Sequence, residues 1–189
     1  MDLVARLAAL VEQLRPEHGR VVVGIDGPDT AGKTTLADRL AAALPGSART
    51  SIDDFMRPRA ERYGRGELDP EGYYRDSFDD AALLAAIDAA PSPVVLVDGV
   101  FLHRPSLLRA FTLTVYLRVT AEEVLRRAVV RDTGLMGSAT DVRRRYTRRY
   151  LPGQALYRRE ADPEGRADVL VDNEDVAAPR VLRWTLSRS

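Results

Sequence analysis

The sequence has 189 residues, of which 45% are hydrophobic, and its 28 basic side chains balance 28 acidic ones. This length and composition fit one globular domain, and zero net charge gives no general attraction to nucleic acid or anionic membranes. The absence of cysteine excludes disulfides, zinc–thiolate sites and thiol nucleophiles.

The first segment, residues 1–16, has the pattern of an amphipathic helix that Pro16 is expected to end. Asp2, Arg6 and Glu12 interrupt its apolar positions, so it is neither a signal peptide nor a membrane span. The expected location of the protein is therefore the cytoplasm.

The rest of the chain alternates short apolar runs with helical patterns. Strands are predicted at 20–27, 48–53, 94–99, 112–119, 166–173 and 180–186. Helices are predicted at 33–44, 77–90 (with Ser77 as the cap), 121–132 and about 141–150, and a long polar connection at 54–76. This alternation predicts an α/β fold with a mostly parallel sheet and helices on both faces. No repeat or long linker divides the chain, so residues 1–189 are expected to form a single domain.

The segment GPDTAGKT at 27–34 matches G-x-x-x-x-G-K-[ST], the pattern of a phosphate-binding loop, or P-loop. A chance glycine-rich turn is the alternative, but the strand before it and the helix after it favour the P-loop. Lys33 would meet the β and γ phosphates, and Thr34 would offer its hydroxyl to Mg²⁺. ATP and Mg²⁺ are the expected cofactors. The residues expected to hold the nucleotide are Gly27, Asp29, Thr30, Ala31, Gly32, Lys33, Thr34 and Thr35.

Hydrolases, switches and kinases share this loop, and a kinase also needs a base and a carboxylate near the metal. Asp53 and Asp54 follow a predicted strand, where side chains project into the ligand crevice, but strand periodicity does not choose between them. Alternatively, both only cap a loop. Asp98 ends another strand and is the expected metal carboxylate, with Gly99 permitting close approach to a ligand; a plain turn aspartate is the alternative.

Arginines near residue 130 supply candidate cations for the transferred phosphoryl group. Arg127 and Arg131 are spaced i, i+4 on a predicted helix and share one face. Gly134 and Gly137 suit a mobile lid, expected over about 127–150. The later run at 143–149 fits a solvated helix face, and zero net charge argues against a nucleic-acid surface.

Seven segments in order resemble the uridine kinase family of P-loop kinases, whose relatives act on nicotinamide riboside, pantothenate and ribulose phosphate. They are GIDGPDTAGKTT, SIDDFMRPR, ELDPEGYYRDSFD, VLVDGVFL, RAVVRD, YLPGQALY and ADVLVDN, spanning about 20 to 173. The resemblance implies a P-loop NTPase fold with a helical lid. In the family a catalytic aspartate precedes a short residue and an aromatic one, which here gives Asp53, Asp54 and Phe55. Asp53 is then the base, while Asp54 bonds the loop backbone or a metal-bound water.

The resemblance also implies substrate contacts. Asp69 matches the family's acidic residue that grips sugar hydroxyls, Asp98 a strand-end carboxylate, and Arg127 and Arg131 the lid arginines. One departure lies at 90–94, where uridine kinases insert a base-contacting hairpin and this chain has only PSP. The resemblance therefore does not imply recognition of uracil. Two aromatic residues of the long loop either stack on a substrate ring or pack the loop down: Tyr73 and Tyr74.

Together these features predict an ATP-dependent phosphotransferase that moves the γ-phosphoryl group to a hydroxyl of a small molecule, most simply a nucleoside. The expected partner is that small-molecule acceptor, with no nucleic acid and no membrane, and a homo-oligomer remains compatible with the sequence. Two alternatives stay open. One is a kinase of an antibiotic, vitamin or natural product, and the other is a non-catalytic nucleotide-binding module.

Overall fold

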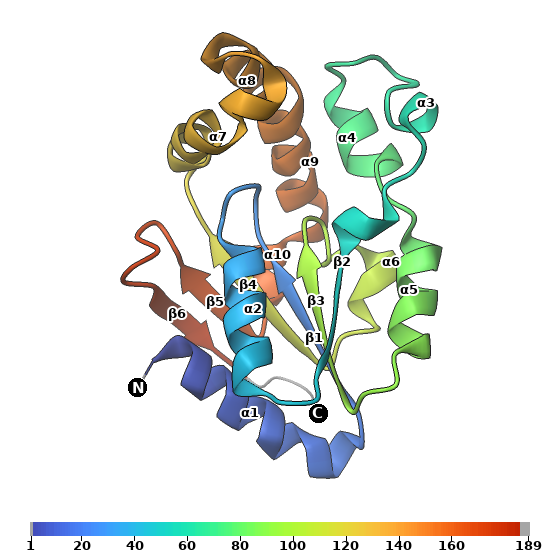
Figure 1. Cartoon of the computed structure of the whole chain (residues 1–189), viewed down its shortest axis with the longest axis vertical. Coiled ribbons are helices and arrows are strands. Elements are labelled where there is room, and N and C mark those ends of the chain that lie inside the picture. Colours follow the sequence, from blue (N-terminus) through green and yellow to red (C-terminus); the bar gives the residue numbers. More distant parts are fainter. Residues whose placement is uncertain (1, 186–189) are drawn as a thin grey trace.

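The computed structural model describes residues 2–185, which form one six-stranded sheet between two layers of helices (Figure 1). The strand order is β2-β3-β1-β4-β5-β6. Neighbouring strands are parallel except for β5 and β6, which are antiparallel. The strands are β1 (Val21–Asp26), β2 (Ala48–Ser51), β3 (Val94–Gly99), β4 (Leu113–Arg118), β5 (Val169–Asp172) and β6 (Arg180–Trp184). The predicted α/β fold with a mostly parallel sheet is confirmed.

The central strands are buried on both faces, which explains why they are almost continuously apolar. In β1, Val21, Val23 and Ile25 pack into one core, whereas Val22 packs into the other. Helices α1 (Leu3–His18) and α2 (Lys33–Ala43) cover the first face. Helices on the second face are α5 (Asp80–Ala89), α6 (Pro105–Leu108) and α10 (Pro163–Arg166). The carboxyl ends of the parallel strands therefore meet at one edge.

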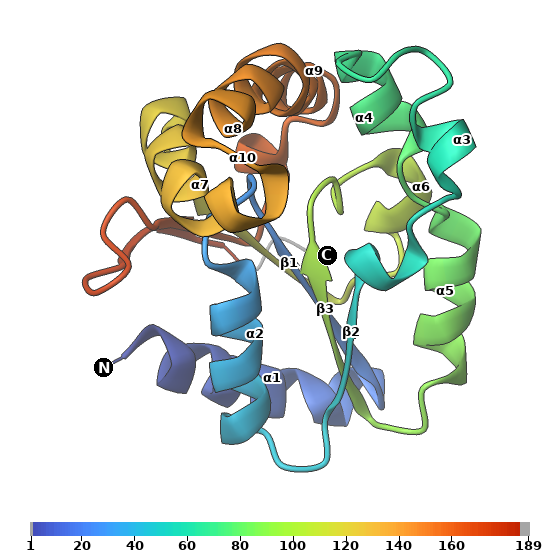
Figure 2. The ribbon, with the colours of Figure 1, turned by 45° about the horizontal axis from the view of Figure 1, so that its top comes forward.

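Two groups of helices stand above that edge, and Figure 2 shows the space between them over the ends of β1, β2 and β3. The first group consists of α7 (Ala121–Met136), α8 (Ala139–Arg145), a π-helical turn (Tyr146–Tyr150) and α9 (Leu151–Ala161). The second consists of α3 (Arg59–Arg62) and α4 (Pro70–Asp76), and α4 packs against α9. Within residues 2–185, no helix is long and apolar enough to cross a membrane.

Several helix boundaries differ from the prediction. Helix α1 continues through Pro16 to His18, because a proline in the last turn removes only one backbone hydrogen bond there. Helix α7 continues to Met136 rather than ending near residue 132. Gly134 lies inside it, since one helical glycine costs only about 1 kcal/mol. Gly137 ends the helix with φ 99°, in the left-handed region that favours glycine.

The segment 54–76, predicted as a long polar connection, contains regular structure. It contains α3 and α4, and Asp69 caps α4, where its Oδ1 accepts a hydrogen bond from the Gly72 N–H at 2.6 Å. The predicted cap of the following helix was wrong. Asp79 caps α5 by accepting from the Ala82 N–H at 3.0 Å, and the Ser77 hydroxyl instead donates to the Gly72 carbonyl at 3.3 Å.

Gly99, at the end of β3, makes room for a neighbouring side chain rather than for a ligand. A Cβ atom at this position would lie 2.3 Å from Ile52 Cγ2. We therefore expect Gly99→Ala to lower the free energy of unfolding by about 1–3 kcal/mol, the usual cost of overpacking a core. Gly134→Ala is the matched control, since no atom lies within 4 Å of the added Cβ, and it should stabilise helix α7 slightly. Urea unfolding of both variants measures the difference, and equal stabilities would contradict the expected clash.

Candidate active site

The P-loop connects β1 to α2 and adopts a backbone that only some residues tolerate. Gly27 has φ 155° and Gly32 has φ 90°, and Thr30 also has a positive φ, of 59°. A Cβ on Gly27 would lie 2.7 Å from the Leu117 carbonyl oxygen of β4, so the loop needs glycine there. Asn173, just after β5, fixes another part of the loop, because its side-chain amide donates to the Ala31 carbonyl at 2.7 Å. Such a loop at a helix N-terminus is suited to cradling phosphate oxygens.

A buried carboxylate supports the start of this loop. The Asp26 side chain, fully buried at the end of β1, accepts a hydrogen bond from the Gly27 N–H at 2.6 Å. It also contacts His103 Nδ1 at 2.7 Å and the Tyr157 hydroxyl. His103 is therefore a buried structural partner of the strand that carries the P-loop.

Lys33 is the single lysine of the sequence and lies at the first position of α2. Its Nζ donates to the Pro28 carbonyl at 2.7 Å, a bond to the loop backbone. Burial lowers the pKa of Lys33, although nearby carboxylates, Asp29 foremost, act to raise it. A partly desolvated ammonium beside the loop is suited to binding the charge of a phosphate.

Thr34 and Asp98 form a pair of oxygen ligands next to the loop. The Thr34 hydroxyl donates to Asp98 Oδ2 at 2.9 Å, and Asp98 is 2% exposed. Arg49 of β2 contacts the other carboxylate oxygen at 3.1 Å. Residues 2–185 contain no group of three or more histidine, cysteine or acidic residues placed to hold a metal by themselves. The pair still fits Mg²⁺, which binds to one or two protein oxygens together with substrate phosphates and water.

The chain turns sharply after β2, and this turn separates the two adjacent aspartates. Residues Ile52–Phe55 form a short 3-10 helix that Ser51 caps. The Ser51 hydroxyl accepts from the Asp53 N–H, and Asp54 accepts from the Ser51 N–H, both at 3.4 Å. Asp54 is thus bonded to the loop backbone, one of the two arrangements that the family resemblance implied. The side chain of Asp53 lines a cavity beside the P-loop.

The pKa of Asp53 lies above its ordinary value. Desolvation by surrounding protein atoms is the largest cause of the raised pKa, although Asp53 is exposed to solvent in this structure. The carboxylates of Asp29 and Asp98 raise the pKa further, and Lys33 opposes them. A carboxylate with a raised pKa is a better proton acceptor than an ordinary aspartate once it is ionised.

The cavity beside Asp53 has a volume of about 290 Å³, and both groups of helices contribute to its lining. Asp29 of the P-loop and Asp53 lie on its wall. Aromatic side chains supply much of the remaining lining: Tyr63, Tyr73, Phe78, Tyr146 and Tyr150. Its cations are Arg62, Arg131 and Arg149. An aromatic cavity with a few charged groups next to a P-loop suits a ring-bearing small molecule.

The other residues predicted to bind substrate lie in different places. Tyr73 lines the cavity, whereas Tyr74 is buried in the core, with its ring centroid 5.1 Å from that of Phe101. Asp69 lies outside the cavity lining, with one oxygen committed to capping α4. Phe55 is partly buried and packs against the same core rather than lining the cavity. Of the four, only Tyr73 contributes to the cavity wall.

The two candidate lid arginines do not meet in one cavity. Arg127 donates to the carbonyl of Thr30 in the P-loop at 3.1 Å and to the carbonyls of Asn173 and Glu174 after β5. Arg131 lines the cavity, where it pairs with Asp132 at 2.5 Å and donates to the Tyr146 hydroxyl at 3.2 Å. Arg127 therefore joins helix α7 to the P-loop, whereas Arg131 lies on the cavity wall.

The sequence analysis did not single out several residues that shape the cavity. Arg149 is 2% exposed rather than solvated, and it donates to the carbonyls of Arg62 and Asp69 at 2.8 and 2.9 Å. Its guanidinium lies 4.5 Å from the ring centre of Tyr63. The sequence did contain one signal of this wall. Tyr146 and Tyr150 are four residues apart, and residues at this spacing lie on the same face of a helix.

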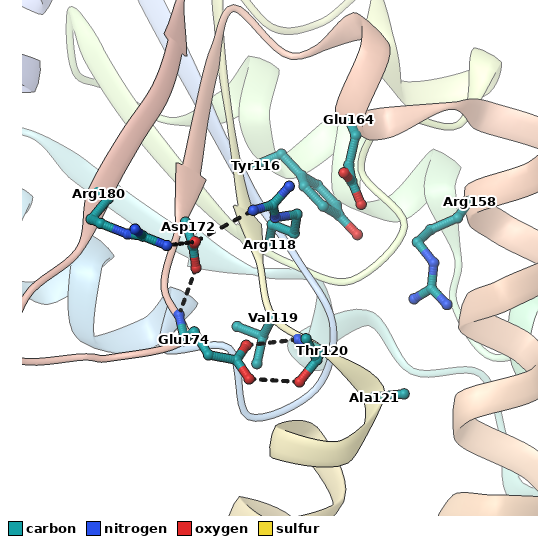
Figure 3. Close-up of a pocket in the computed structure, with 10 residues that line it drawn as sticks. All are labelled: Tyr116, Arg118, Val119, Thr120, Ala121, Arg158, Glu164, Asp172, Glu174 and Arg180. Carbon is teal, nitrogen blue, oxygen red and sulfur yellow. Dashed lines mark hydrogen bonds and ion pairs between the residues drawn. The ribbon is translucent and has the colours of Figure 1, made fainter.

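Other cavities lie away from this one, and two of them adjoin the strand ends or the P-loop helix. The larger, about 510 Å³, lies beyond the ends of β4 and β5 (Figure 3). Two of its carboxylates already have partners, because Asp172 binds Arg118 and Arg180 and Glu174 binds Thr120. The other, about 240 Å³, adjoins the P-loop helix and is mostly apolar. It is lined by Leu3, Gly32, Thr35, Leu36, Leu117, Asn173, Val176 and Pro179.

Comparison with known proteins agrees with this geometry. The chain is 28% identical over 135 residues to nicotinamide riboside kinase 1 of Mus musculus, which covers 59% of this chain and 67% of that protein. The fold matches a possible uridine kinase from Bacillus stearothermophilus with a TM-score of 0.67 and 24% identity, covering 90% of this chain and 99% of the other. It also matches a candidate fructose transport system kinase from a Silicibacter species (TM-score 0.68, 22% identity, 84% and 95% covered). No family model matches the chain.

The sheet order, the P-loop and these likenesses define the class of protein as a P-loop kinase fold. Within that class, the chain is similar in sequence to a nicotinamide riboside kinase and in fold to a possible uridine kinase.

Proposed function

We propose that the protein transfers the γ-phosphoryl group of ATP to a hydroxyl of a nucleoside or a nucleoside-like small molecule. One observation carries this proposal: Asp53, with its raised pKa, lies on the wall of an aromatic cavity that adjoins the P-loop. The relative that is a nicotinamide riboside kinase supports the same class of acceptor. The proposal takes residues 1–189 as a single kinase domain, in which the lid at about 127–150 forms part of the first helical group.

The nucleotide has a matching place on the other side of the P-loop. The apolar cavity beside α2 includes Gly32 and Thr35 of the P-loop region and Val176 after β5, and it can take a planar base. Arg127 closes the adjoining wall through its bonds to Thr30 and Asn173. Phosphates would extend from this cavity over the loop toward Lys33. The base and the acceptor would then occupy opposite sides of the loop.

The chemistry follows from the groups between the two cavities. Asp53 accepts the proton of the acceptor hydroxyl as its oxygen forms a bond to the γ-phosphorus, and the bond from phosphorus to the ADP oxygen breaks. Lys33 and Arg131 stabilise the charge on the transferring group. Thr34 and Asp98 would hold Mg²⁺, which neutralises phosphate charge when bound. The aromatic side chains exclude water and stack on the acceptor ring.

The acceptor assignment is tested by ADP release from ATP and Mg²⁺ with single added compounds. The panel contains uridine, cytidine, adenosine and nicotinamide riboside, with pantothenate and kanamycin as non-nucleoside compounds. We expect ADP and a phosphorylated product, identified by mass spectrometry, with at least one nucleoside. Transfer only to pantothenate or kanamycin would replace the nucleoside by another acceptor class. ADP release that no compound accelerates would favour a non-catalytic nucleotide-binding module.

A further inference from the structure

The P-loop carries a carboxylate that phosphate binding does not explain. Asp29, the third residue of the loop, lines the acceptor cavity. A negative charge close to bound phosphates is repulsive, so a carboxylate in this loop is unfavourable unless it faces another ligand. No salt bridge within residues 2–185 involves Asp29, and its two hydrogen-bond donors are neutral. The charge of Asp29 is thus held in place without being neutralised by a direct ion pair.

Those two donors fix the direction of the Asp29 side chain. The Tyr73 hydroxyl of α4 donates to Oδ2 at 2.9 Å, and the Gln154 side-chain amide of α9 donates to the same oxygen at 2.7 Å. Both donor side chains are buried and therefore fixed in position, since Tyr73 is 7% and Gln154 2% exposed. Tyr73 also packs edge-on against Tyr150 with ring centres 4.8 Å apart. The carboxylate is therefore preorganised by elements from both helical groups.

Unused hydrogen-bonding capacity remains in this cluster. No hydrogen bond from residues 2–185 reaches Oδ1 of Asp29, since both donors bind Oδ2. The Oε1 atom of Gln154 is buried and also has no partner among those residues. Native proteins rarely leave a buried polar atom unpaired unless a ligand or water completes it. The cluster is thus short of donors, which a hydroxyl-bearing molecule would supply.

We propose that Asp29 binds a second hydroxyl of the acceptor through Oδ1, while Asp53 receives the hydroxyl that is phosphorylated. This assignment rests on the proposed kinase function and deepens it. Because both carboxylates lie on the wall of one cavity, the preferred acceptor carries at least two hydroxyls, as a sugar or other polyol does. Tyr73 and Gln154 are positioning residues, acting only through Asp29. Asp29, rather than Asp69, then distinguishes a polyol from a single alcohol.

The test combines Asp29→Asn with nucleosides that lack one hydroxyl. Wild type should prefer uridine over 2′-deoxyuridine or 3′-deoxyuridine in kcat/KM by about 10- to 100-fold, the usual value of one charge-assisted hydrogen bond. Asp29→Asn should raise KM for uridine by a similar factor and largely remove that preference. Tyr73→Phe, which keeps the ring but loses the bond to Asp29, should show a smaller change in KM with kcat less affected.

Calorimetry with ADP and Mg²⁺ separates an acceptor role from a nucleotide role. Asp29→Asn should bind ADP at least as tightly as wild type, because a negative charge near the phosphates has been removed. A tenfold weaker ADP affinity, or unchanged KM and unchanged preference between the nucleosides, overturns the proposal.

A second experiment distinguishes failure of the proposed nucleoside kinase function from failure of the proposed role of Asp29. If wild type phosphorylates no nucleoside, the probes become D-ribose and ribitol, added with ADP and Mg²⁺, and the readout is the melting temperature. A rise in wild type that Asp29→Asn abolishes supports the role of Asp29 even though the nucleoside function has failed. An equal rise in both proteins, or no rise in wild type, overturns it.

Discussion

Asp53→Asn should lower kcat by roughly 10²- to 10⁴-fold, the usual contribution of a positioned general base. The amide keeps the shape of the side chain but cannot accept the hydroxyl proton. ADP affinity should change little, because Asp53 lines the acceptor cavity rather than the P-loop. Steady-state turnover with the best acceptor of the panel and calorimetry with ADP measure the two effects separately.

Asp54→Asn is the matched control, one residue away on the same turn. Its carboxylate accepts from the Ser51 backbone, and an amide oxygen can do the same, so turnover should stay near the wild-type value. A larger loss in Asp54→Asn than in Asp53→Asn would reverse the two roles.

The pH dependence gives a second measure of the same base. The raised pKa of Asp53 should place the acid limb of kcat/KM above the range of an ordinary aspartate, because only the ionised form accepts a proton. For stability the sign is opposite to the usual carboxylate case. Since folding raises this pKa, the charged form is disfavoured in the folded state, and stability is lost as the pH rises through the folded value. Asp53→Asn should therefore melt at or above the wild-type temperature at neutral pH, which excludes unfolding as the cause of lost turnover.

Lys33→Met should reduce kcat/KM by about 10²- to 10³-fold, as expected for removing one preorganised charge from a transition state. Methionine keeps the unbranched apolar stem and removes only the ammonium. The variant also loses the hydrogen bond from Lys33 to the Pro28 carbonyl. The loss of positive charge should have the larger effect, because four carboxylates lie near the ammonium. Turnover and ADP calorimetry measure it, and wild-type values for both would remove Lys33 from the site.

Arg126→Met is the control for a general loss of positive charge. Arg126 is on the same helix as Arg127 but points to solvent, 66% exposed, and pairs with Glu123. Exposed ion pairs contribute little, so this variant should retain wild-type turnover.

The sequence predicted the parts of the site that depend on local pattern. The P-loop could be predicted because its motif is contiguous and its strand and helix are apolar and periodic. Strand periodicity could not choose between Asp53 and Asp54, because the chain leaves β2 at Ser51 and forms a 3-10 turn. The turn, rather than the alternation of a strand, determines which carboxylate faces the cavity.

The acceptor side was harder to predict because tertiary contacts assemble it. Tyr63 and Arg149 lie far apart in the sequence but stack in the structure. Arg149 belongs to a run of arginines that suggested a solvated face, yet backbone carbonyls around α4 bind its guanidinium. Asp69 was assigned to sugar hydroxyls through the family resemblance, whereas its Asp-Pro pair starts helix α4. Local sequence gives no information on which helices converge.

The presence of a single lysine makes the phosphate site chemically addressable. A neutral amine attacks an acylating reagent, and the lowered pKa of Lys33 increases its neutral fraction at mild pH. Apart from the α-amino group, such a reagent finds no other amine, since the remaining 27 basic side chains are guanidinium groups. Reduced acylation of Lys33 in the presence of nucleotide would report on occupancy of the P-loop, and peptide mass spectrometry separates it from acylation of the α-amino group. Because every other basic side chain that could compete is a guanidinium group, Lys33 serves as a footprinting probe without an engineered label.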